Sequence, residues 1–506
     1  MSDPMQNQAA EIRADGRAMA IGSGWMVAMR WAVRGIGLVS TMILARLLTP
    51  QDFGLVAKAM LVIGMLEIMA ETGQRLAIIR HSQPTRAHYD TAWTIGLIVN
   101  GTLALAMFAA APLAELVFHE PGAVPVVRIL ALRTLLNGLE NIGTIDFRRN
   151  MQFGKDFQYN IITKLLSFAV TISLAFHFRN YIALVGGIVI GQVILVAVSY
   201  VISPYRPRLS LATAAELWSF SIWVLVASTG NYILGRLDQW VLSTQASASL
   251  MGKYSVGSEL AQLPSSEVVA PATRALYPAY CRLFAKSLDE MTQALITNLR
   301  FVAIVCASTG VGIACVARDF TLVLLGSQWS DTSQFIVYIA LASAIYSFNG
   351  CAAATLTITG HARSGGVLAW TRVGIAAPCI VLGFKLGGAL GVAQAILIAD
   401  ILFTPGVYIE VMKTIPLTPK TMLEIVWRPL LASAAMAAVL MSHPFAHLGP
   451  ASLRLLLEVG LGAATFTIAL LLLWLASGRP AGGEAYLVSY FQRIARPNML
   501  SDIRDN

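Results

Sequence analysis

Residues 24–80 read GWMVAMRWAVRGIGLVSTMILARLLTPQDFGLVAKAMLVIGMLEIMAETGQRLAIIR. Two apolar runs, each long enough to cross a bilayer, are joined here by the short turn LLTPQDFG (47–54). Charges interrupt both runs, at Arg30, Arg34, Lys58, Glu67 and Glu71. A charge at the bilayer centre costs at least about 2.5–3.5 kcal/mol on insertion scales, so such residues normally face a bundle interior or a wet cavity. The stretch therefore predicts a membrane hairpin with polar inner faces.

The composition extends this prediction to the whole chain. Of the 506 residues 56% are hydrophobic and 12% are charged, and the mean hydropathy is +0.67. Soluble chains are roughly 45–50% apolar and about 25% charged. The first nineteen residues are polar and mixed in charge, which is wrong for a cleavable signal peptide, so the first span is expected to be permanent. The five cysteines form no CxxC pair and the histidines no metal-binding spacing, so we predict no cofactor and no metal. The longest outside segments expected from the apolar runs have only about ten residues, too few to hold catalytic residues above the bilayer, so we predict none.

Apolar runs of about 20 residues, the length that crosses a bilayer, recur along the chain. They predict an all-α polytopic membrane protein of about fourteen transmembrane helices. The expected spans are 21–45, 53–77, 90–114, 123–145, 158–178, 181–202, 217–242, 253–278, 293–316, 333–356, 366–384, 388–411, 427–445 and 453–476.

The basic residues of the connecting segments predict the orientation. If both termini lie in the cytoplasm, the inside segments hold 21 Lys and Arg residues and the outside segments hold 6. Cytoplasmic loops of membrane proteins carry such an excess, which also accounts for the net charge of +9 without nucleic acid. We therefore expect a multi-pass membrane protein with both termini cytoplasmic.

A faint internal repeat divides the chain. MILARLLTPQDFGLV (42–56) resembles WVLSTQASASLMGKY (240–254), which aligns Gly54 with Gly252. IALVGGIVIGQVILV (182–196) likewise resembles GALGVAQAILIADIL (388–402). The offset of about six spans predicts two parallel-repeat lobes of six helices around a central cavity. The predicted parts are an N-lobe (1–205), a C-lobe (206–415), two appended spans (416–478) and a cytoplasmic tail (479–506).

Helical periodicity indicates which charges would line that cavity. Arginine's planar fork suits phosphate oxygens and lysine adds a point charge, so a cationic set predicts binding of a pyrophosphate headgroup. The predicted headgroup-binding residues are Arg30, Arg34, Lys164 and Arg236. The predicted polar cavity residues, available for ion coupling, are Glu67, Glu71, Asp238 and Glu259. As an alternative, Glu67 and Glu71 pair with Arg30 and Arg34 and close the N-lobe.

Several motifs, in this order and spacing, give the chain a family resemblance. They are ILARLLTPQDFGLVA (43–57), ETGQRLAIIR (71–80), FRRNMQFGKDF (147–157), NYILGRLDQWVLSTQASASLMGKYSVGSELAQLP (231–264) and RALYPAYCRL (274–283). The chain resembles the polysaccharide flippases of the multidrug/oligosaccharidyl-lipid/polysaccharide superfamily, in the branch similar to lipopolysaccharide and colanic-acid exporters. The resemblance extends from the first span to about the twelfth.

The resemblance implies a two-lobed transporter that flips an undecaprenyl-pyrophosphate-linked oligosaccharide across the inner membrane for exopolysaccharide or lipopolysaccharide biosynthesis. Arg30 and Arg34, and then Arg236, match the family's basic cavity positions best. The implied partners are the lipid-linked oligosaccharide, membrane lipids and a polymerase with other assembly proteins. Two alternatives remain open: a drug/cation antiporter of the same superfamily, and a membrane-embedded polysaccharide polymerase or ligase.

Overall fold

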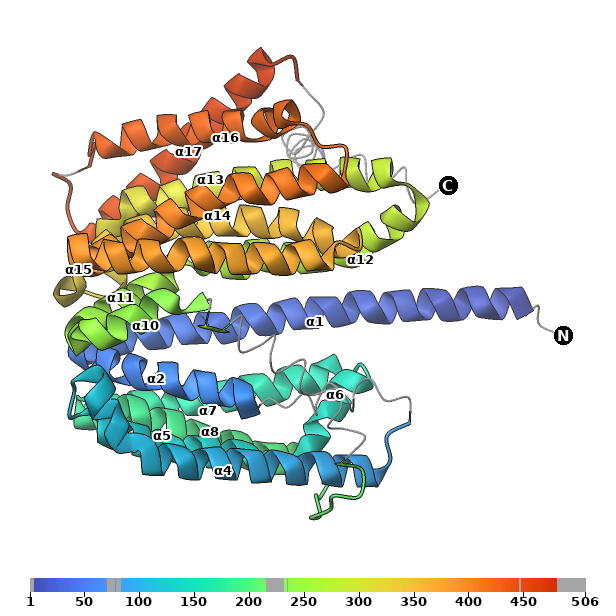
Figure 1. Ribbon diagram of the computed structural model, residues 1–506, viewed down its shortest axis with the longest axis vertical. Helices are drawn as coiled ribbons and strands as arrows, with labels where there is room; N and C mark the ends of the chain where they lie inside the picture. Colours follow the sequence, from blue (N-terminus) through green and yellow to red (C-terminus); the bar gives the residue numbers. More distant parts are fainter. Residues whose placement is uncertain are drawn as a thin grey trace. The chain divides into compact units, whose positions relative to one another are not determined.

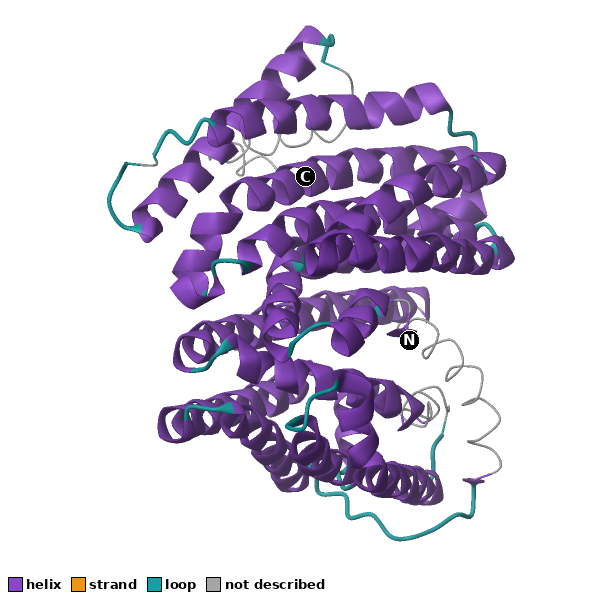
Figure 2. Ribbon diagram, turned by 60° about the vertical axis from the view of Figure 1, so that its left-hand side comes forward, coloured by secondary structure: helices purple, strands orange, loops and turns teal. Residues whose placement is uncertain are grey.

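The computed structural model describes residues 4–70, 78, 83–214, 232–233, 235–445 and 447–479; up to residue 24, and at residues 69–70 and 362, it describes the backbone alone. The described residues are helical throughout apart from turns and short connections, with no strand among them (Figure 2). This confirms the predicted all-α class. By their internal contacts the residues form two compact units, unit 1 (Met1–Ser255) and unit 2 (Val256–Asn506). The lobe bounds expected from the sequence remain predictions.

Unit 1 is a helical bundle, and its helices are labelled in Figure 1. Its helices are α1 (Pro4–Leu47), α2 (Pro50–Ala70), α4 (Arg86–Phe118), α5 (Ala123–Gly138), α6 (Ile145–Arg149), α7 (Phe153–Phe178), α8 (Tyr181–Ile202), α10 (Leu237–Gln245) and the first turns of α11 (Ala248–Ala261). The turn between α1 and α2 is set locally, because the Thr49 amide donates to Asp52 Oδ2 at 2.9 Å and the Asp52 amide to Thr49 Oγ1 at 3.3 Å. This reciprocal cap, with Pro50 at the first helical position, fixes where α2 begins.

The core of unit 1 lies among α2, α4, α5 and α8. It is built from small and branched side chains such as Ala59, Ala111, Val126 and Val185, which are buried together. Because these helices also pack along one another, α2 is surrounded by protein over its middle turns. That position shelters the charges of α2 from lipid.

An extended strap follows α8 and is bound to α4. Asp90 Oδ1 accepts hydrogen bonds from the Tyr205 hydroxyl and, at 2.9 Å, from the Arg208 amide. The Ser210 amide donates to Thr94 Oγ1 at 3.0 Å. Burial, followed by the hydrogen bond and charge of Asp90, raises the pKa of Tyr205 above its ordinary value, so the phenol stays a donor. The segment 203–213 is therefore an integral part of unit 1.

Unit 2 contains the remaining helices. They are the last turns of α11, a π-helical turn (Ser265–Val269), α12 (Ala270–Lys286), α13 (Leu288–Leu324), α14 (Thr332–Ile358), α15 (Ala362–Thr414), α16 (Pro419–Met441) and α17 (Ala451–Ala476). α16 and α17 pack on α13 through a cluster that includes Val316, Met436 and Phe466. The last two expected spans thus share the packing of unit 2.

The label α15 covers two helices joined by a reversal. Gly387 and Gly388 have non-helical backbone angles, and Gly388 has φ +59°, a conformation that L side chains rarely adopt. On either side of the reversal Gly383 and Gly391 lie back to back, because a Cβ on Gly383 would meet the Gly391 carbonyl oxygen at 2.4 Å. The reversal falls where the sequence separates the spans 366–384 and 388–411, so that boundary is confirmed.

Two predicted spans are wrong in detail. The fourth (123–145) ends as a helix at Gly138, so α5 is only about 24 Å long against roughly 30 Å of hydrocarbon. The eighth (253–278) is divided into α11, the π-helical turn and α12, because Pro264 and Pro271 remove backbone donors from a regular ladder. Among the described residues nine helices, α15 counted as one, are long and apolar enough to cross a membrane. The total of fourteen therefore remains a prediction.

Candidate functional site

The two arginines of α1 lie on a shielded face. Arg30 and Arg34 are part-buried, as are Gly37 and Thr41 on the same helical stripe. The adjoining exposed stripe consists of Trp31, Gly35 and Val39. An apolar exposed stripe beside a shielded cationic one is the distribution expected of a membrane helix with a polar inner face. This distribution is consistent with the prediction that Arg30 and Arg34 face away from lipid.

Lys164 of α7 lies near the level of these arginines. α1 packs along α7, and the Trp25 and Phe157 ring centroids are 5.0 Å apart. An α-helix rises 1.5 Å per residue, so Lys164 lies about 10 Å along α7 from Phe157. Along α1, Arg30 lies about 7 Å and Arg34 about 13 Å from Trp25. Three of the four predicted cations are therefore carried at similar depth by two neighbouring helices of unit 1.

Arg236, the fourth cation, is held by different elements. It is exposed at the N-terminal cap of α10, where its Nη1 donates to Gln239 Oε1 at 3.0 Å and its guanidinium lies 5.5 Å from the centre of the Tyr232 ring. The Tyr232 hydroxyl donates to the Leu61 carbonyl of α2 at 2.9 Å. The absence of a side chain at Gly64 makes room for that hydroxyl, since a Cβ there would lie 2.3 Å from it. Arg236 is thus positioned on α2 through an aromatic ring.

The predicted carboxylates have separate surroundings. Glu67 of α2 forms an ion pair with Arg133 of α5, each about one quarter exposed. Asp238 accepts a hydrogen bond of 2.7 Å from the Tyr254 hydroxyl, and Glu259 is exposed on the part of α11 that belongs to unit 2. Glu71 lies outside the described residues. The ion pair that joins Glu67 to Arg133 was not among the pairings expected from the sequence, because periodicity gives the face of a helix and not its neighbour.

The two aligned glycines of the repeat touch each other in unit 1. A Cβ on Gly54 of α2 would lie 1.6 Å from the Ala248 carbonyl oxygen, and one on Gly252 of α11 would lie 1.9 Å from the Pro50 carbonyl oxygen. Each glycine contacts the residue four positions before the other, so the contact is symmetric. The alignment of Gly54 with Gly252 therefore has a structural counterpart, which we call the glycine crossing.

A buried lysine secures the glycine crossing. Lys58, one turn after Gly54, has a fully buried side chain whose Nζ lies 3.6 Å from Glu120 Oε1. Nζ also donates to the carbonyl oxygens of Ala246 at 2.8 Å and Phe118 at 3.3 Å. Glu120 in turn accepts from the Ala248 amide at 2.9 Å. Lys58 is therefore a structural cation that links α2, the end of α4 and the start of α11.

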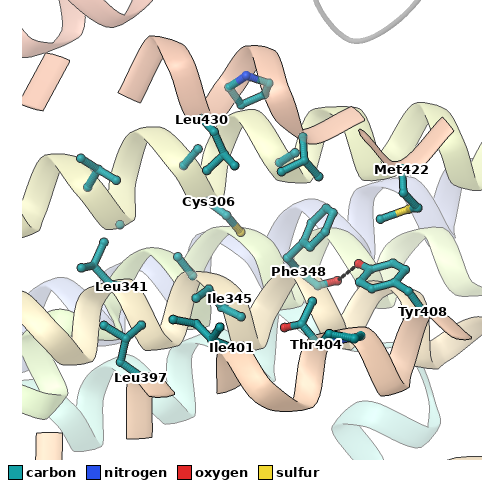
Figure 3. Close-up of a pocket in the computed structure, with 18 residues that line it drawn as sticks. Cys306, Leu341, Ile345, Phe348, Leu397, Ile401, Thr404, Tyr408, Met422 and Leu430 are labelled. Carbon is teal, nitrogen blue, oxygen red and sulfur yellow. Dashed lines mark hydrogen bonds between the residues drawn. The ribbon is translucent and has the colours of Figure 1, made fainter. Parts of the chain in front are cut away.

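Unit 2 contains an apolar pocket of about 560 Å³ among α13, α14, the second half of α15, and α16 (Figure 3). Cys306, Phe348, Tyr408 and Met422 contribute to its lining, and the Tyr408 hydroxyl donates to the Phe348 carbonyl at 3.3 Å. Thr404 is the other polar side chain there, and its hydroxyl donates to the Asp400 carbonyl at 2.7 Å. The sequence did not predict this pocket, because its lining residues come from four separate apolar runs.

The pair Glu67–Arg133 allows a test of how the α2–α5 contact is held. We expect Arg133→Met to lower the free energy of unfolding by about 1–3 kcal/mol, because Glu67 is left part-buried without its cation. In Glu67→Gln/Arg133→Met the loss should be smaller than the sum of the single losses by at least about 0.5 kcal/mol. Thermal unfolding of the detergent-solubilised protein measures both.

Arg128→Met, at an exposed position of the same helix, is the control. If the loss in the double variant equals the sum of the two single losses, Glu67 and Arg133 do not form a pair.

The described helices and their shielded charges define a multi-pass, all-helical membrane protein. A family model described as "Polysaccharide biosynthesis protein" matches residues 43–334, more than half of the chain. The chain belongs to this polysaccharide biosynthesis protein family, which confirms the family resemblance noted in the sequence.

Two curated relatives extend over most of the chain. The succinoglycan biosynthesis transport protein ExoT of Rhizobium meliloti (strain 1021) is 27% identical over 461 residues, which are 89% of this chain and 92% of the relative. The lipopolysaccharide biosynthesis protein WzxC of Escherichia coli (strain K12) is 24% identical over 414 residues, 78% of this chain and 81% of the relative.

Solved structures share the fold. The lipid II flippase MurJ in an inward closed conformation matches with a TM-score of 0.74 at 13% identity, over 89% of this chain and 99% of that one. An inward-facing multidrug resistance transporter of the MATE family in the MOP superfamily matches with a TM-score of 0.58 at 14% identity. The match covers 75% of this chain and 94% of that one. At these identities the likeness concerns the fold.

Proposed function

We propose that this protein is an alternating-access flippase that moves an undecaprenyl-pyrophosphate-linked oligosaccharide across the inner membrane, for exopolysaccharide or lipopolysaccharide biosynthesis. The family membership supports a role in polysaccharide assembly. The curated relatives, one of them named as a transport protein, support a transporter and not an enzyme. The fold is one that a lipid flippase also uses.

The observation that carries the proposal is the cationic set on α1 and α7. Arg30 and Arg34 are part-buried on a helix that is long and apolar enough to span a membrane, and Lys164 is near their depth on the neighbouring α7. Cations held in a low-dielectric surrounding bind phosphate oxygens through charge-assisted hydrogen bonds, which are about twice as strong as neutral ones. We assign the pyrophosphate to these residues, with Arg236 as a further contact.

The apolar pocket of unit 2 supports a substrate that carries a lipid. Its lining of aliphatic, aromatic and thioether side chains suits a hydrocarbon chain, which gains dispersion contacts there without burying a polar group. A pocket in the range of about 300–1,000 Å³ is the usual size for a small ligand or a part of a larger one. We assign part of the polyprenyl chain to it.

The remaining assignments belong to the same proposal. Glu67, Glu71, Asp238 and Glu259 are the carboxylates available for ion coupling. The protein would lie in the bacterial inner membrane with both termini in the cytoplasm and would pass its product to a polymerase and other assembly proteins. A drug/cation antiporter would need an anionic site for its cationic substrate, and the surplus of arginine on α1 disfavours it. A polymerase or ligase is disfavoured by the relative that is named as a transport protein.

Export of the polymer in a deletion strain complemented with variants tests the function. We expect Arg30→Gln/Arg34→Gln to reduce export by at least about tenfold, because each lost charge-assisted hydrogen bond is worth roughly 1.5–3 kcal/mol. Arg30→Lys/Arg34→Lys should retain part of the activity, since the charge remains without the fork.

Arg128→Gln, on the exposed side of α5, is the matched control and should export normally. Membrane abundance is measured for every variant, so that loss of protein is separated from loss of transport. Normal export by the double glutamine variant at normal abundance would show that these arginines do not bind the substrate.

A further inference from the structure

One arginine in unit 2 stands in the middle of an apolar run. Arg372 lies in GGVLAWTRVGIAAPCIVLGF (365–384), in the first half of α15. Placing such a charge near the centre of a membrane helix is unfavourable on insertion scales. A partner carboxylate offsets part of that cost, but removing both charges would avoid it altogether. The position of Arg372 therefore calls for a role beyond helix packing.

The guanidinium of Arg372 is held in one orientation from two sides. Its Nε lies 2.9 Å from Oδ1 of Asp400, whose side chain is only 3% exposed. Its central carbon lies 4.3 Å from the centre of the Tyr346 ring, a cation–π distance. The carboxylate comes from the second half of α15 and the ring from α14, so the contacts of three helical segments fix the group.

A second layer of hydrogen bonds supports Asp400. The Thr404 hydroxyl donates to the Asp400 carbonyl oxygen at 2.7 Å, and Asn349 Nδ2 donates to Thr404 Oγ1 at 2.9 Å. Asn349 is buried on α14, three residues beyond Tyr346. The turn that carries the carboxylate is thus tied to the helix that carries the ring, which keeps the guanidinium in a fixed position.

Most donors of this guanidinium remain available. In the part of the chain that the structure describes, Nε of Arg372 is the nitrogen that binds a protein acceptor, and its two Nη groups have no hydrogen-bond partner. The side chain is 24% exposed, and Tyr346 beneath it is 52% exposed. The donors therefore face accessible space over an exposed aromatic ring.

A second arginine of unit 2 shows what a structural pair looks like in this fold. Arg454 of α17 donates from Nε to Asp319 Oδ2 at 2.8 Å and from Nη2 to Oδ1 at 2.9 Å, and its Nη1 donates to the Gly449 carbonyl at 3.2 Å. Every nitrogen of that guanidinium is engaged. Arg372 instead uses one nitrogen for its carboxylate and presents the other two.

We propose that Arg372 is an oxyanion-binding residue of unit 2, oriented by Asp400 and Tyr346, which contacts an anionic group of the translocated molecule through its Nη donors. The inference rests on the proposed function, since it assigns a contact to the same substrate. A planar fork with two free nitrogens matches the oxygens of a phosphate or a carboxylate. The anion is thus either the pyrophosphate of the lipid carrier or the carboxylate of an acidic sugar.

Direct binding to the full-length protein in detergent tests the proposal and separates the two sources. The probes are farnesyl pyrophosphate, with farnesol as its uncharged counterpart, and glucuronic acid. We expect Arg372→Gln to weaken binding of one anionic probe about tenfold, the loss of a charge-assisted hydrogen bond, and to leave farnesol unchanged. Weaker binding of farnesyl pyrophosphate assigns the anion to the pyrophosphate headgroup. Weaker binding of glucuronic acid assigns it to an acidic sugar.

Three further variants keep the test decisive. Tyr346→Leu removes an exposed ring and should weaken the same probe about threefold. Arg372→Lys keeps the charge beside Asp400 but lacks the fork, so it should fold even where Arg372→Gln does not and bind at least about threefold more weakly. Arg363→Gln, at an exposed position in the first turn of α15, is the matched control and should bind like the parent protein.

The outcomes separate this inference from the proposed function. If the folded Arg372 and Tyr346 variants bind both anionic probes within twofold of the parent protein, the inference is wrong, whatever the Arg30 and Arg34 variants do in export. If export is independent of Arg30 and Arg34 while Arg372→Gln loses probe binding, the anion site stands and the assignment of the pyrophosphate to Arg30 and Arg34 fails. If the deletion strain exports the polymer without this protein, the proposed function fails, whatever Arg372 binds.

Discussion

Gly54→Ala is expected to destabilise the protein by about 3 kcal/mol or more. The added Cβ would lie 1.6 Å from the Ala248 carbonyl oxygen, and this neighbour is backbone that cannot rotate away. Overpacking in a close-packed contact typically costs about 1–3 kcal/mol and more where backbone must move. Gly252→Ala should have a similar effect, because its Cβ would lie 1.9 Å from the Pro50 carbonyl oxygen. The measurement is the unfolding midpoint of the purified protein, with the monodisperse yield in detergent beside it.

Gly35→Ala is the matched control for this prediction. Gly35 lies on the exposed face of α1, and a Cβ added there would meet no atom within 4 Å. Alanine at this position should therefore be neutral or stabilise by up to about 1 kcal/mol through its higher helix propensity. Equal stability of the Gly54 and Gly35 variants would show that α2 and α11 do not touch at the glycine crossing.

Lys58→Met is expected to cost about 3–5 kcal/mol, the usual loss when one partner of a buried ion pair is removed. The Lys58 side chain is fully buried, and its removal leaves Glu120 and the carbonyl oxygens of Phe118 and Ala246 without their shared donor. Methionine fills similar volume, so the loss reports the polar contacts. Chemical or thermal unfolding of the purified protein provides the comparison.

A double variant separates charge from packing. Lys58→Met/Glu120→Gln should recover part of the loss, because no unpaired carboxylate then remains at the end of α4. Lys155→Met, at an exposed position of α7, serves as the control and should change stability by less than about 0.5 kcal/mol. A double variant no more stable than Lys58→Met alone would mean that Glu120 is not the partner that matters.

The fold was predictable to the extent that long apolar runs in the sequence indicate membrane helices. The boundary at Gly387–Gly388 was found because the apolar stretch 366–411 is long enough for two spans of about 20 residues. The short α5 and the divided eighth span were missed, because an apolar run shows that a segment is buried or in lipid but not that its backbone stays α-helical. Pro264 and Pro271 predict a bend in the second of these, but not the π-helical turn that divides it.

The candidate site was less predictable than the fold. Periodicity placed Arg30 and Arg34 on a common stripe of α1, but it could not give Glu67 its partner Arg133, which comes from a helix 66 residues later in the chain. Lys58 was recognised as a charge in an apolar run, yet its structural role depends on carbonyl oxygens, which no side-chain pattern reveals. Arg372 had the same signal as Arg30, a cation inside an apolar span, and was not singled out.

The glycine crossing also places one shared constraint on the two segments of the internal repeat. A contact in which Gly54 meets Ala248 while Gly252 meets Pro50 is isologous, the kind that two identical subunits form about a two-fold axis. Each glycine leaves room for a backbone carbonyl of the other segment, so one constraint applies to both positions at once. A side chain at either position would meet backbone, so glycine at one position permits the close approach only together with glycine at the other.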